Sequence, residues 1–580
     1  MKLKFEYQNK LAEELAASLA EVVGVPVAEI KWEHPTTEEH GDWATAVALN
    51  LKFKIKNLKL SPREQAEKLV ETWQKRGLPD YVDRAEAAGP GFINVWLKKE
   101  YLITQLQEVL EAKEKYGRSD FLDGKKIMVE FAHPNTHKEL HIGHMRTLIT
   151  GEALARIFTA SGAAIFRANY QGDIGPHVAK SLWGTQKLMI EKKLGWEAVD
   201  DWSLAQKAHL LGEGYVYGVA HYSDNKAEID ALNQKLYRHD PAVWPVYEQT
   251  RAWSLAYYQS FYERFYTRFD QLFFESEVAD QGKKLVLKNL GRVFAKGEGG
   301  AIIFDGKKYG LHKRVFITAT GTPTYEAKDM ALVYAQFKAF SFDLNIHIVA
   351  NEQAGYFQVI IKAMEIMDPL FVDRQYHLSM GMVQLVGQKM SSRTGVILKV
   401  DDLIEGVKKA IRLLIKNEEL KGEAKEILAE KIAIGAIKYS ILATDPTQNA
   451  LFDLQKSISL EGNSGPYLQY TYARCQSVLA KSGQSIVGAQ FIAPATQEEL
   501  SLLRTLYRFP EAVGEATVNF APNLICNYLY DLAQKFNTFY NKHRVIGSDQ
   551  QEFRLALTAA TGQVLRNGLT LLGIIAPERM

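Results

Sequence analysis

Cysteine is almost absent from this chain, since Cys475 and Cys526 are the two it has in 580 residues. Two cysteines cannot build a disulfide framework or a cysteine-based zinc module. Long hydrophobic runs are missing as well, because none reaches the roughly 18 residues of a membrane-spanning helix. The first residues, as far as Gly24, have the charged pattern of an amphipathic helix and not of a signal peptide. We therefore expect a cytoplasmic protein with no membrane contact.

An excess of either charge sign is also lacking. The chain has 70 Lys and Arg against 68 Asp and Glu, a formal net charge of +2. Such a balance does not by itself predict a nucleic-acid partner, although a local basic face is compatible with it. With 47% hydrophobic and 24% charged residues the composition is that of a globular protein. Disordered, collagen-like and coiled-coil classes are excluded.

Four segments with different residue patterns follow one another along the chain. The first has helical periodicity from Leu11 to Val22, a second amphipathic stretch at 41–54 and a strand pattern at 88–97. From about residue 400 onward the pattern is almost entirely helical. We predict an α+β domain at residues 1–115 and an α/β domain at 116–400, with an insertion at about 178–295. A helical connector should follow at 401–460 and an all-α domain at 461–580.

The second segment opens with the pattern of a parallel sheet. The short apolar runs KIMVEF (126–131) and AAIFRANY (163–170) have the character of buried strands. Between them, apolar residues at helical spacing run from Met145 to Phe158 and stop at Ser161. Strand, helix and strand in so short a stretch predict a βαβ unit, and therefore an α/β fold around a parallel sheet. Further strand patterns occur at 299–310, 313–320 and 342–350.

The sequence PNTHKELHIGH (134–144) lies where the first strand turns into the helix. The first N–H groups of a helix lack partners and carry partial positive charge, so they attract phosphate. Gly143 leaves room for a ligand against the backbone. His141 and His144 are three residues apart and share one face. We expect both imidazoles to donate hydrogen bonds to phosphate oxygens as charge builds at phosphorus.

Metal binding is the alternative for this stretch. His133, His137, His141 and His144 fall close together, as in some metal hydrolases. A matching set of carboxylate or cysteine ligands is not evident in the sequence, so we expect no tightly bound metal.

A second polar loop, GQKMSSRTG (387–395), follows the last strand pattern. Its glycines permit movement, and its hydroxyl groups with the cations Lys389 and Arg393 can surround a polyphosphate. A solvated basic turn would have the same composition.

The two motifs together resemble the signature of the class I aminoacyl-tRNA synthetases, and within that class the arginyl-tRNA synthetases. The resemblance covers essentially the whole chain. It rests on VEFAHPNTHKELHIGHMR, NYQGDIG (169–175), GTPTYEAKDMA (321–331), GDWATAVALNL, GPGFINV, GPYLQYTYAR (465–474), LAQKFNTFYNKHRV (532–545) and APERM (576–580). It implies a Rossmann-like parallel-sheet catalytic domain with a helical insertion, an N-terminal α+β tRNA-binding domain and a C-terminal all-α anticodon-binding domain.

The resemblance also implies a two-step reaction. ATP would activate L-arginine to arginyl-adenylate, and the 2′-hydroxyl of the terminal adenosine of tRNA(Arg) would then take the arginyl group. Catalysis would consist of positioning and stabilisation of phosphate charge, with no protein nucleophile. ATP is a substrate, Mg²⁺ would arrive with it, and we expect a monomer.

Site residues follow from the positions that match the family's motifs. The catalytic residues implied are His141, Gly143, His144, Lys138, Lys389, Ser391 and Arg393. The ATP-binding residues implied are His141, His144, Gly172, Asp173, Met390 and Ser392. The arginine-binding residues implied are Glu130, Asn135, His144, Glu275, Tyr325, Asp329 and Gln353. The tRNA-binding residues implied are Phe92, Asn94, Tyr467, Gln469, Arg474, Tyr540 and Arg544.

The substrate assignment has a physical reason behind it. A guanidinium is planar and permanently charged, and needs carboxylates in a fork geometry. Tyr325 and Asp329 are four residues apart at a helix start, so they share one face. Glu130 is expected to help orient Asn135.

The chain departs from the family pattern at two places. Ser392 stands where the second motif usually has lysine, and Lys138 occupies the position thought to supply the missing charge. His133 stands where the family often has a small serine. Three alternatives stay open: a related class I ligase with another amino acid or acceptor, a catalytically silent tRNA-binding protein, and the metal hydrolase.

Overall fold

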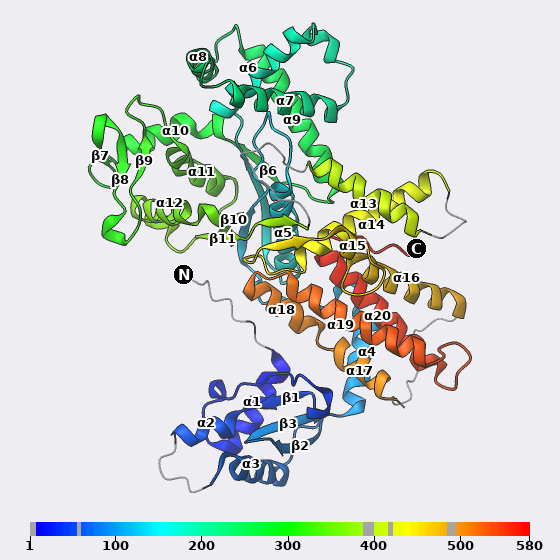
Figure 1. Cartoon of the computed structure of the whole chain (residues 1–580). Helices are drawn as coiled ribbons and strands as arrows, with labels where there is room; N and C mark the ends of the chain where they lie inside the picture. Colours follow the sequence, from blue (N-terminus) through cyan, green and yellow to red (C-terminus); the bar gives the residue numbers. More distant parts are fainter. Residues whose placement is uncertain are drawn as a thin grey trace.

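The protein is described here by a computed structural model, which covers residues 7, 9–54, 60–386, 399–415, 421–483, 494 and 496–580, with backbone alone at 52–54. Figure 1 shows a central sheet, a helical lobe above it, a second lobe beside it and a large helical lobe on the other side. The N-terminal lobe hangs below the helical one. The described helices include none that is long and apolar enough to cross a membrane.

The central sheet has five parallel strands in the order β11-β10-β4-β5-β6. Their bounds are β4 (Lys126–Glu130), β5 (Ala164–Gln171), β6 (Gln271–Phe274), β10 (Leu344–Ala350) and β11 (Gln375–Met380). Helix α5 (Ile142–Ala160) joins β4 to β5, which confirms the predicted βαβ unit. Ile127, Met128 and Val129 are fully buried, as expected of a strand covered on both faces. The carboxyl ends of the strands form the edge where α/β proteins place ligands.

A helical lobe stands over that edge (Figure 1). It consists of α6 (Pro176–Glu191), α7 (Leu204–Ala220), α8 (Lys226–Tyr237) and α9 (Trp244–Arg264). The predicted insertion at 178–295 extends too far, because β6 lies inside that range and pairs with β5. With four residues, β6 is too short to show a periodicity of its own.

The second lobe carries a separate small sheet. It contains α10 (Glu275–Lys288), β7 (Ala295–Lys296), β8 (Ile302–Phe304), β9 (Arg314–Ile317), α11 (Tyr325–Ala339) and α12 (Ala354–Met367). The strand patterns predicted at 299–310 and 313–320 form this antiparallel sheet, in the order β7-β8-β9, and do not extend the parallel one.

The N-terminal lobe is an antiparallel sheet in the order β1-β3-β2, covered by helices. Its elements are α1 (Lys10–Val23), β1 (Trp43–Thr45), α2 (Val47–Lys54), α3 (Pro62–Arg76), β2 (Val82–Ala88) and β3 (Phe92–Leu97). The stretch at 41–54, predicted as a second amphipathic segment, is a short strand followed by a helix. The predicted connecting helix is α4 (Lys99–Ala112).

The described residues of the remaining lobe are helical apart from one short parallel strand pair, β12 (Val383–Leu385) with β13 (Ala450–Phe452). Its helices are α13 (Val400–Leu414), α14 (Glu423–Leu442), α15 (Leu454–Ser457), α16 (Gly465–Ser482), α17 (Gln497–Leu506), α18 (Phe509–Asn519), α19 (Asn523–Lys542) and α20 (Gln551–Leu571). Its buried side chains belong to the same hydrophobic core as α5.

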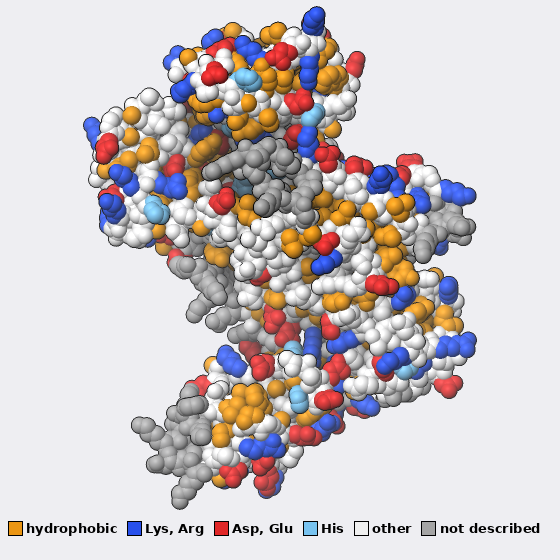
Figure 2. All heavy atoms as spheres, in the orientation of Figure 1, with side chains coloured by type: hydrophobic (Ala, Val, Ile, Leu, Met, Phe, Trp, Pro, Cys, Tyr) orange, Lys and Arg blue, Asp and Glu red, His pale blue; other side chains and the backbone are white. Residues whose placement is uncertain are grey.

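Ion pairs join the N-terminal lobe to this helical lobe. Asp42 is fully buried; its Oδ1 lies 2.9 Å from Arg504 Nε, and the Leu97 N–H donates to its Oδ2 at 2.9 Å. His34 Nε2 lies 2.8 Å from a carboxylate oxygen of Glu511. Figure 2 shows side chains of both charge signs where the two lobes meet.

Candidate functional site

His141 and His144 cap the start of α5 and each other. His141 is the N-cap, and its side chain accepts a hydrogen bond from the Gly143 N–H at 3.1 Å. The His141 N–H donates in turn to His144 Nδ1 at 3.4 Å, and the two rings stack with centroids 3.7 Å apart. Because Nδ1 accepts in both rings, the proton of each neutral imidazole is assigned to Nε2.

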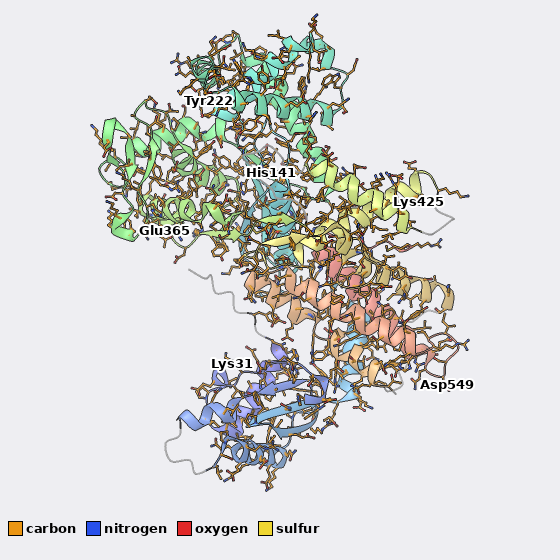
Figure 3. All side chains as sticks on the ribbon, in the orientation of Figure 1. Lys31, His141, Tyr222, Glu365, Lys425 and Asp549 are labelled. Atoms are coloured by element: carbon orange, nitrogen blue, oxygen red, sulfur yellow. The ribbon has the colours of Figure 1, made fainter. Side chains whose placement is uncertain are left out.

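Both imidazoles stay neutral near pH 7. Burial lowers the pKa of His141 to about 4, with the charge of Lys138 adding to the effect. Burial also lowers the pKa of His144 well below its ordinary value, helped by His141 and Lys138. Both rings are therefore N–H donors and not cations. Figure 3 labels His141 at the upper end of the sheet, below the insertion.

Two glycines keep this loop closely packed. A Cβ at Gly143 would lie 3.0 Å from His141 Cε1 and Nδ1. A Cβ at Gly172 would lie 2.1 Å from Asn135 Oδ1 and 3.1 Å from Glu275 Oε1. The Gly172 carbonyl accepts from the Thr136 N–H at 2.9 Å. Gly172 is thus required for the close approach of the two loops.

Helix α9 of the insertion holds the loop between β4 and α5. The Tyr258 hydroxyl lies 2.6 Å from the Asn135 carbonyl oxygen and 2.8 Å from that of Lys138. His137, with a left-handed φ of 62°, donates its N–H to Ser254 Oγ at 3.0 Å and pairs through Nε2 with Thr250 Oγ1 at 2.8 Å. This buried histidine is part of the scaffold of the loop, as are its neighbours on α9.

Lys138 and Asp173 lie on either side of this arrangement. The Lys138 Nζ stands 4.2 Å from the centre of the Tyr215 ring. Asp173 is fully buried and accepts from the Ser276 N–H at 2.9 Å, while Arg251 Nε donates to it at 2.9 Å. These contacts make Asp173 an anchor beneath the site, and its predicted contact with ATP stays a prediction.

A cavity of about 400 Å³ opens beside the loop. Volumes of about 300–1,000 Å³ are usual for small-molecule sites. Its lining includes six of the predicted arginine-binding residues, Glu130, Asn135, Glu275, Tyr325, Asp329 and Gln353. The seventh, His144, does not line it. Residues far apart in the sequence thus meet in one cavity, as predicted.

Three of the cavity's carboxylates already have a basic partner. Glu275 Oε2 lies 2.6 Å from Lys328 Nζ, both groups being buried. Glu130 Oε1 lies 3.2 Å from His347 Nδ1, and Glu130 also accepts from Gln336. Glu326 Oε1 lies 3.0 Å from Arg314 Nη1. Glu130 therefore contacts His347 and Gln336, and the predicted pairing with Asn135 is not seen among the described contacts.

Asp329 is different, because within the described part of the chain it has no cationic partner. Its Oδ2 accepts from the Tyr356 hydroxyl at 2.7 Å. Burial raises the pKa of Asp329 to about 7, and the charges of Glu130 and Glu275 add to the rise. Burial likewise opposes the charge of Glu130, but His347 outweighs it and lowers the pKa of Glu130 to about 2. The Tyr356 hydrogen bond and the charge of His347 oppose the rise of the Asp329 pKa, but within the described residues Asp329 forms no salt bridge.

Sequence patterns did not mark several cavity residues. Lys328, Arg314, His347 and Tyr356 supply the cations and the hydroxyl group that set these charges. Lys328 adjoins Asp329 and could have been found from the same helix. The others come from β9, β10 and α12, and no local spacing connects them.

The second motif, with Lys389, Met390, Ser391, Ser392 and Arg393, lies outside the described residues. The chain re-enters at Lys399, which forms a β-bridge with His141. Lys399 Nζ also lies 3.1 Å from Glu139 Oε1. Lys399, four residues beyond the end of the second motif, is therefore beside the first motif.

A larger groove, of about 1,120 Å³, lies between α16 and α19. Its aromatic and cationic lining comprises Tyr470, Arg474, Lys481, Tyr540, Arg544 and Arg579. The Arg474 guanidinium lies 4.9 Å from the Tyr470 ring centre and 5.1 Å from that of Tyr540. Three predicted tRNA contacts, Arg474, Tyr540 and Arg544, thus share one surface, together with Tyr470 and Lys481, which the sequence analysis did not single out.

Other predicted tRNA contacts are placed differently. Asn94 is 4% exposed in the middle strand of the N-terminal sheet, and Gln469 is fully buried. Gln469 Nε2 donates to the carbonyl oxygens of Ile575 and Lys431, so it ties the core together. Neither is accessible to a nucleic acid, and these two predictions are wrong. Phe92 is half-buried, and the Tyr467 hydroxyl accepts from Asn537 at 2.9 Å.

Comparison with known proteins gives a consistent result. Residues 105–454 match the model for the catalytic domain of class I tRNA synthetases (R). Residues 468–580 match the DALR anticodon-binding domain, and residues 9–97 match the arginyl-tRNA synthetase N-terminal domain.

Individual relatives and structures agree with these domain matches. An arginine–tRNA ligase of Treponema denticola is 32% identical to this chain, and the alignment covers both chains completely. An arginine–tRNA ligase of Bacteroides thetaiotaomicron is 31% identical, and the alignment covers 84% of this chain and 86% of the relative. The structure of Thermus thermophilus arginyl-tRNA synthetase superposes with a TM-score of 0.82 at 27% identity, over 99% of this chain and 100% of that one. An arginyl-tRNA synthetase structure from Plasmodium falciparum, at 19% identity and a TM-score of 0.78, covers 98% of each chain and shares the fold.

Proposed function

The chain belongs to the arginyl-tRNA synthetase family, and from this premise we propose how its residues join arginine to tRNA. In the first step a carboxylate oxygen of L-arginine attacks the α-phosphate of ATP, and the bond to pyrophosphate breaks. In the second, the 2′-hydroxyl of the terminal adenosine of tRNA(Arg) attacks the arginyl carbonyl and releases AMP. The protein positions the reactants and stabilises phosphate charge.

The observation that carries the arginine assignment is that the buried carboxyl group of Asp329 has no salt-bridge partner among the described residues. A permanently cationic guanidinium supplies the partner that this carboxylate lacks. Glu130, Glu275 and Glu326 have cations of their own, so the cavity as a whole has room for one more positive charge. Tyr325, 50% exposed, stands at the cavity mouth one helical turn from Asp329.

The ATP phosphates belong at the start of α5. There the Nε2–H groups of His141 and His144 can donate, and the positive end of the helix dipole lies at the same place. Lys138 adds a positive charge on the same loop. Lys389, Ser391, Ser392, Arg393 and Met390 are proposed to close over the phosphates from the second motif. Mg²⁺ is proposed to bind the phosphate oxygens of ATP, because it prefers phosphate and water to an all-protein cage.

The tRNA is proposed to contact the groove between α16 and α19. Its tyrosines suit unpaired bases, and its arginines and Lys481 suit the backbone phosphates. Phe92, on the N-terminal lobe, remains a proposed second contact.

ATP–pyrophosphate exchange with each amino acid, with and without tRNA, tests the proposed reaction. We expect exchange with arginine and with no other amino acid, and charging of tRNA(Arg) in the presence of ATP and Mg²⁺. Exchange driven by lysine or glutamate would overturn the substrate assignment.

A further inference from the structure

Arg146 is a buried cation near the start of α5. It lies two residues beyond His144 and is 2% exposed. Burial lowers the pKa of Arg146 to about 10, and the charge of Asp445 opposes this, so the guanidinium is charged near pH 7. A buried charge is costly unless it is paired or hydrogen-bonded. The hydrogen-bond partners of Arg146 therefore indicate which part of the molecule it holds.

The hydrogen bonds of this guanidinium to the described residues all end on backbone carbonyl oxygens. Nη1 donates to the Met382 carbonyl at 2.5 Å, and Nη2 donates to that of Gln448 at 2.6 Å. Longer contacts join Nη2 to the carbonyls of Pro446 at 3.3 Å and Asp445 at 3.5 Å. A guanidinium has its donors in a planar fork, so it reaches two chain segments at once. Arg146 thus connects α5 to the residues between β11 and β12 and to the loop before β13.

The residues between β11 and β12 are fixed to the same loop by their backbone. The Gly381 N–H donates to the Pro446 carbonyl at 2.9 Å, and the Met382 N–H donates to Asn449 Oδ1 at 2.8 Å. A Cβ at Gly381 would lie 2.2 Å from the Gln448 carbonyl oxygen, so only glycine permits this approach. This junction, residues 381–382, is therefore held in one position by Arg146 and the loop together.

The junction lies directly before the second motif in the sequence. The motif begins at Gly387, five residues beyond Met382, and only β12 and Val386 lie between them. On the far side of the motif, Lys399 forms a β-bridge with His141 at the start of the same helix. Helix α5 thus holds the chain on both sides of the second motif, through the guanidinium before it and through His141 after it.

We propose that Arg146 is a positioning residue for adenylate formation, which fixes the chain entering the second motif relative to His141 and His144. This rests on the proposed function, in which Lys389 and the two histidines act on the same phosphates. Arg146 touches no reactant and acts through the Met382 carbonyl. A small misplacement of a catalytic group slows the chemical step. Arginine binding should be spared, because Arg146 does not line the arginine cavity.

The test compares substitutions of two arginines in the full chain. Arg146→Met keeps a long apolar stem and removes every donor, while Arg146→Lys keeps the charge with fewer donors. Arg374→Met is the matched control, because Arg374 Nη1 donates to the Phe342 carbonyl at 2.8 Å beside the amino ends of β10 and β11. Calorimetry measures arginine affinity, and thermal unfolding shows that each variant is folded. Pyrophosphate exchange at varied ATP concentration gives kcat and KM.

In Arg146→Met we expect kcat for exchange to fall about tenfold, with KM for ATP and arginine affinity within about twofold of the wild type. Arg146→Lys should recover part of the loss, and Arg374→Met should leave kcat within about twofold. An unchanged kcat in Arg146→Met, an equal loss in Arg374→Met or a parallel loss of arginine affinity would each overturn the proposal. Any of these results would show that the guanidinium contributes only to general packing.

Asn449→Ala is a second test at the same junction and does not require the Arg146 variants to fold. Asn449 is exposed, and its loss removes the acceptor of the Met382 N–H. We expect kcat to fall about threefold, while Thr447→Val, on the same loop, should leave it unchanged because that hydroxyl donates to Asp445. A wild-type kcat in Asn449→Ala would overturn the proposal. A wild-type protein without arginine-dependent exchange would overturn the proposed function, and this proposal with it.

Discussion

The charge of Asp329 explains how a single residue can select a cation. Burial and neighbouring carboxylates hold its pKa at about 7, so the free protein carries this group partly protonated at neutral pH. Arginine keeps its charge at every accessible pH and binds best to the ionised carboxylate. Binding and proton loss are therefore linked at this residue.

Arginine affinity should fall with pH below neutrality. Above pH 7 Asp329 is ionised and the affinity is constant. Below pH 7 the proton must leave before arginine binds, so the dissociation constant should rise about tenfold for each pH unit. Calorimetric titration at pH 6, 7 and 8 measures the dissociation constant. The same titration in buffers of different ionisation enthalpy gives the number of protons released on binding.

Asp329→Asn is the control for this pH dependence. It keeps the shape and removes the charge, so arginine affinity should drop by at least a hundredfold, as expected for a lost charged contact worth about 3 kcal/mol. The remaining weak binding should be independent of pH between 6 and 8. A variant that retained the wild-type slope would assign the titration to another group.

At the scale of elements, α9 supplies the support that the first motif lacks by itself. Asn135 and Lys138 lie in a loop, and their carbonyl groups are held by one hydroxyl from a helix of the insertion. Tyr257, the preceding residue, donates to Asp401 Oδ2 of α13 at 2.6 Å. Two adjacent tyrosines thus connect one helix to the reaction loop and to the helical lobe.

Tyr258→Phe should slow adenylate formation with the protein still folded. The single O–H donor that the two loop carbonyls share is lost, so the loop is less well positioned and kcat for pyrophosphate exchange should fall about tenfold. Tyr257→Phe is the matched control and should change kcat less than twofold, because its hydroxyl contacts α13. Equal effects of the two substitutions would show that α9 acts only through stability.

The groove between α16 and α19 makes a separate prediction. Arg474 is held between the rings of Tyr470 and Tyr540. Arg474→Met should raise KM for tRNA about tenfold through lost stacking and phosphate contact. Arginine affinity should stay unchanged, because the groove is remote from the cavity. Charging kinetics at several tRNA concentrations measure the effect, and an unchanged KM would remove the groove from the tRNA-binding surface.

The same elements show what the sequence can and cannot predict. The βαβ unit and the position of the histidine pair at the start of α5 were predicted correctly because the signals are local: an apolar run, a turn and a fixed spacing. The catalytic role of the pair stays a prediction. Glu275 and Asp173 were recognised as polar residues near the site, but their partners Lys328 and Arg251 lie on other elements. Asn94 and Gln469 were mistaken for surface residues. Both are amides in polar stretches, and the spacing of apolar residues there does not distinguish a buried amide from an exposed one.

At the scale of the whole molecule, the two proposed tRNA-facing lobes contact one another through a buried ion pair. Asp42, in the GDW sequence that resembled a tRNA-binding motif, is buried between them and pairs with Arg504. Its other oxygen accepts from Leu97 of β3. The residue thus connects the N-terminal sheet to α17, and we infer that the two lobes meet tRNA as one preformed surface.

Asp42→Asn should release the N-terminal lobe. Removing one charge of a buried pair leaves the other uncompensated, at a cost of about 3–5 kcal/mol. We expect a larger radius of gyration in X-ray scattering and a KM for tRNA raised about tenfold, with arginine affinity unchanged because the cavity lies in another lobe.

Lys535→Gln is the control: its pair with Glu38, at 3.2 Å, is partly exposed, and such pairs contribute about 0–1 kcal/mol. If Asp42→Asn left both the scattering profile and the KM for tRNA at wild-type values, tRNA recognition would not depend on the docking of the two lobes.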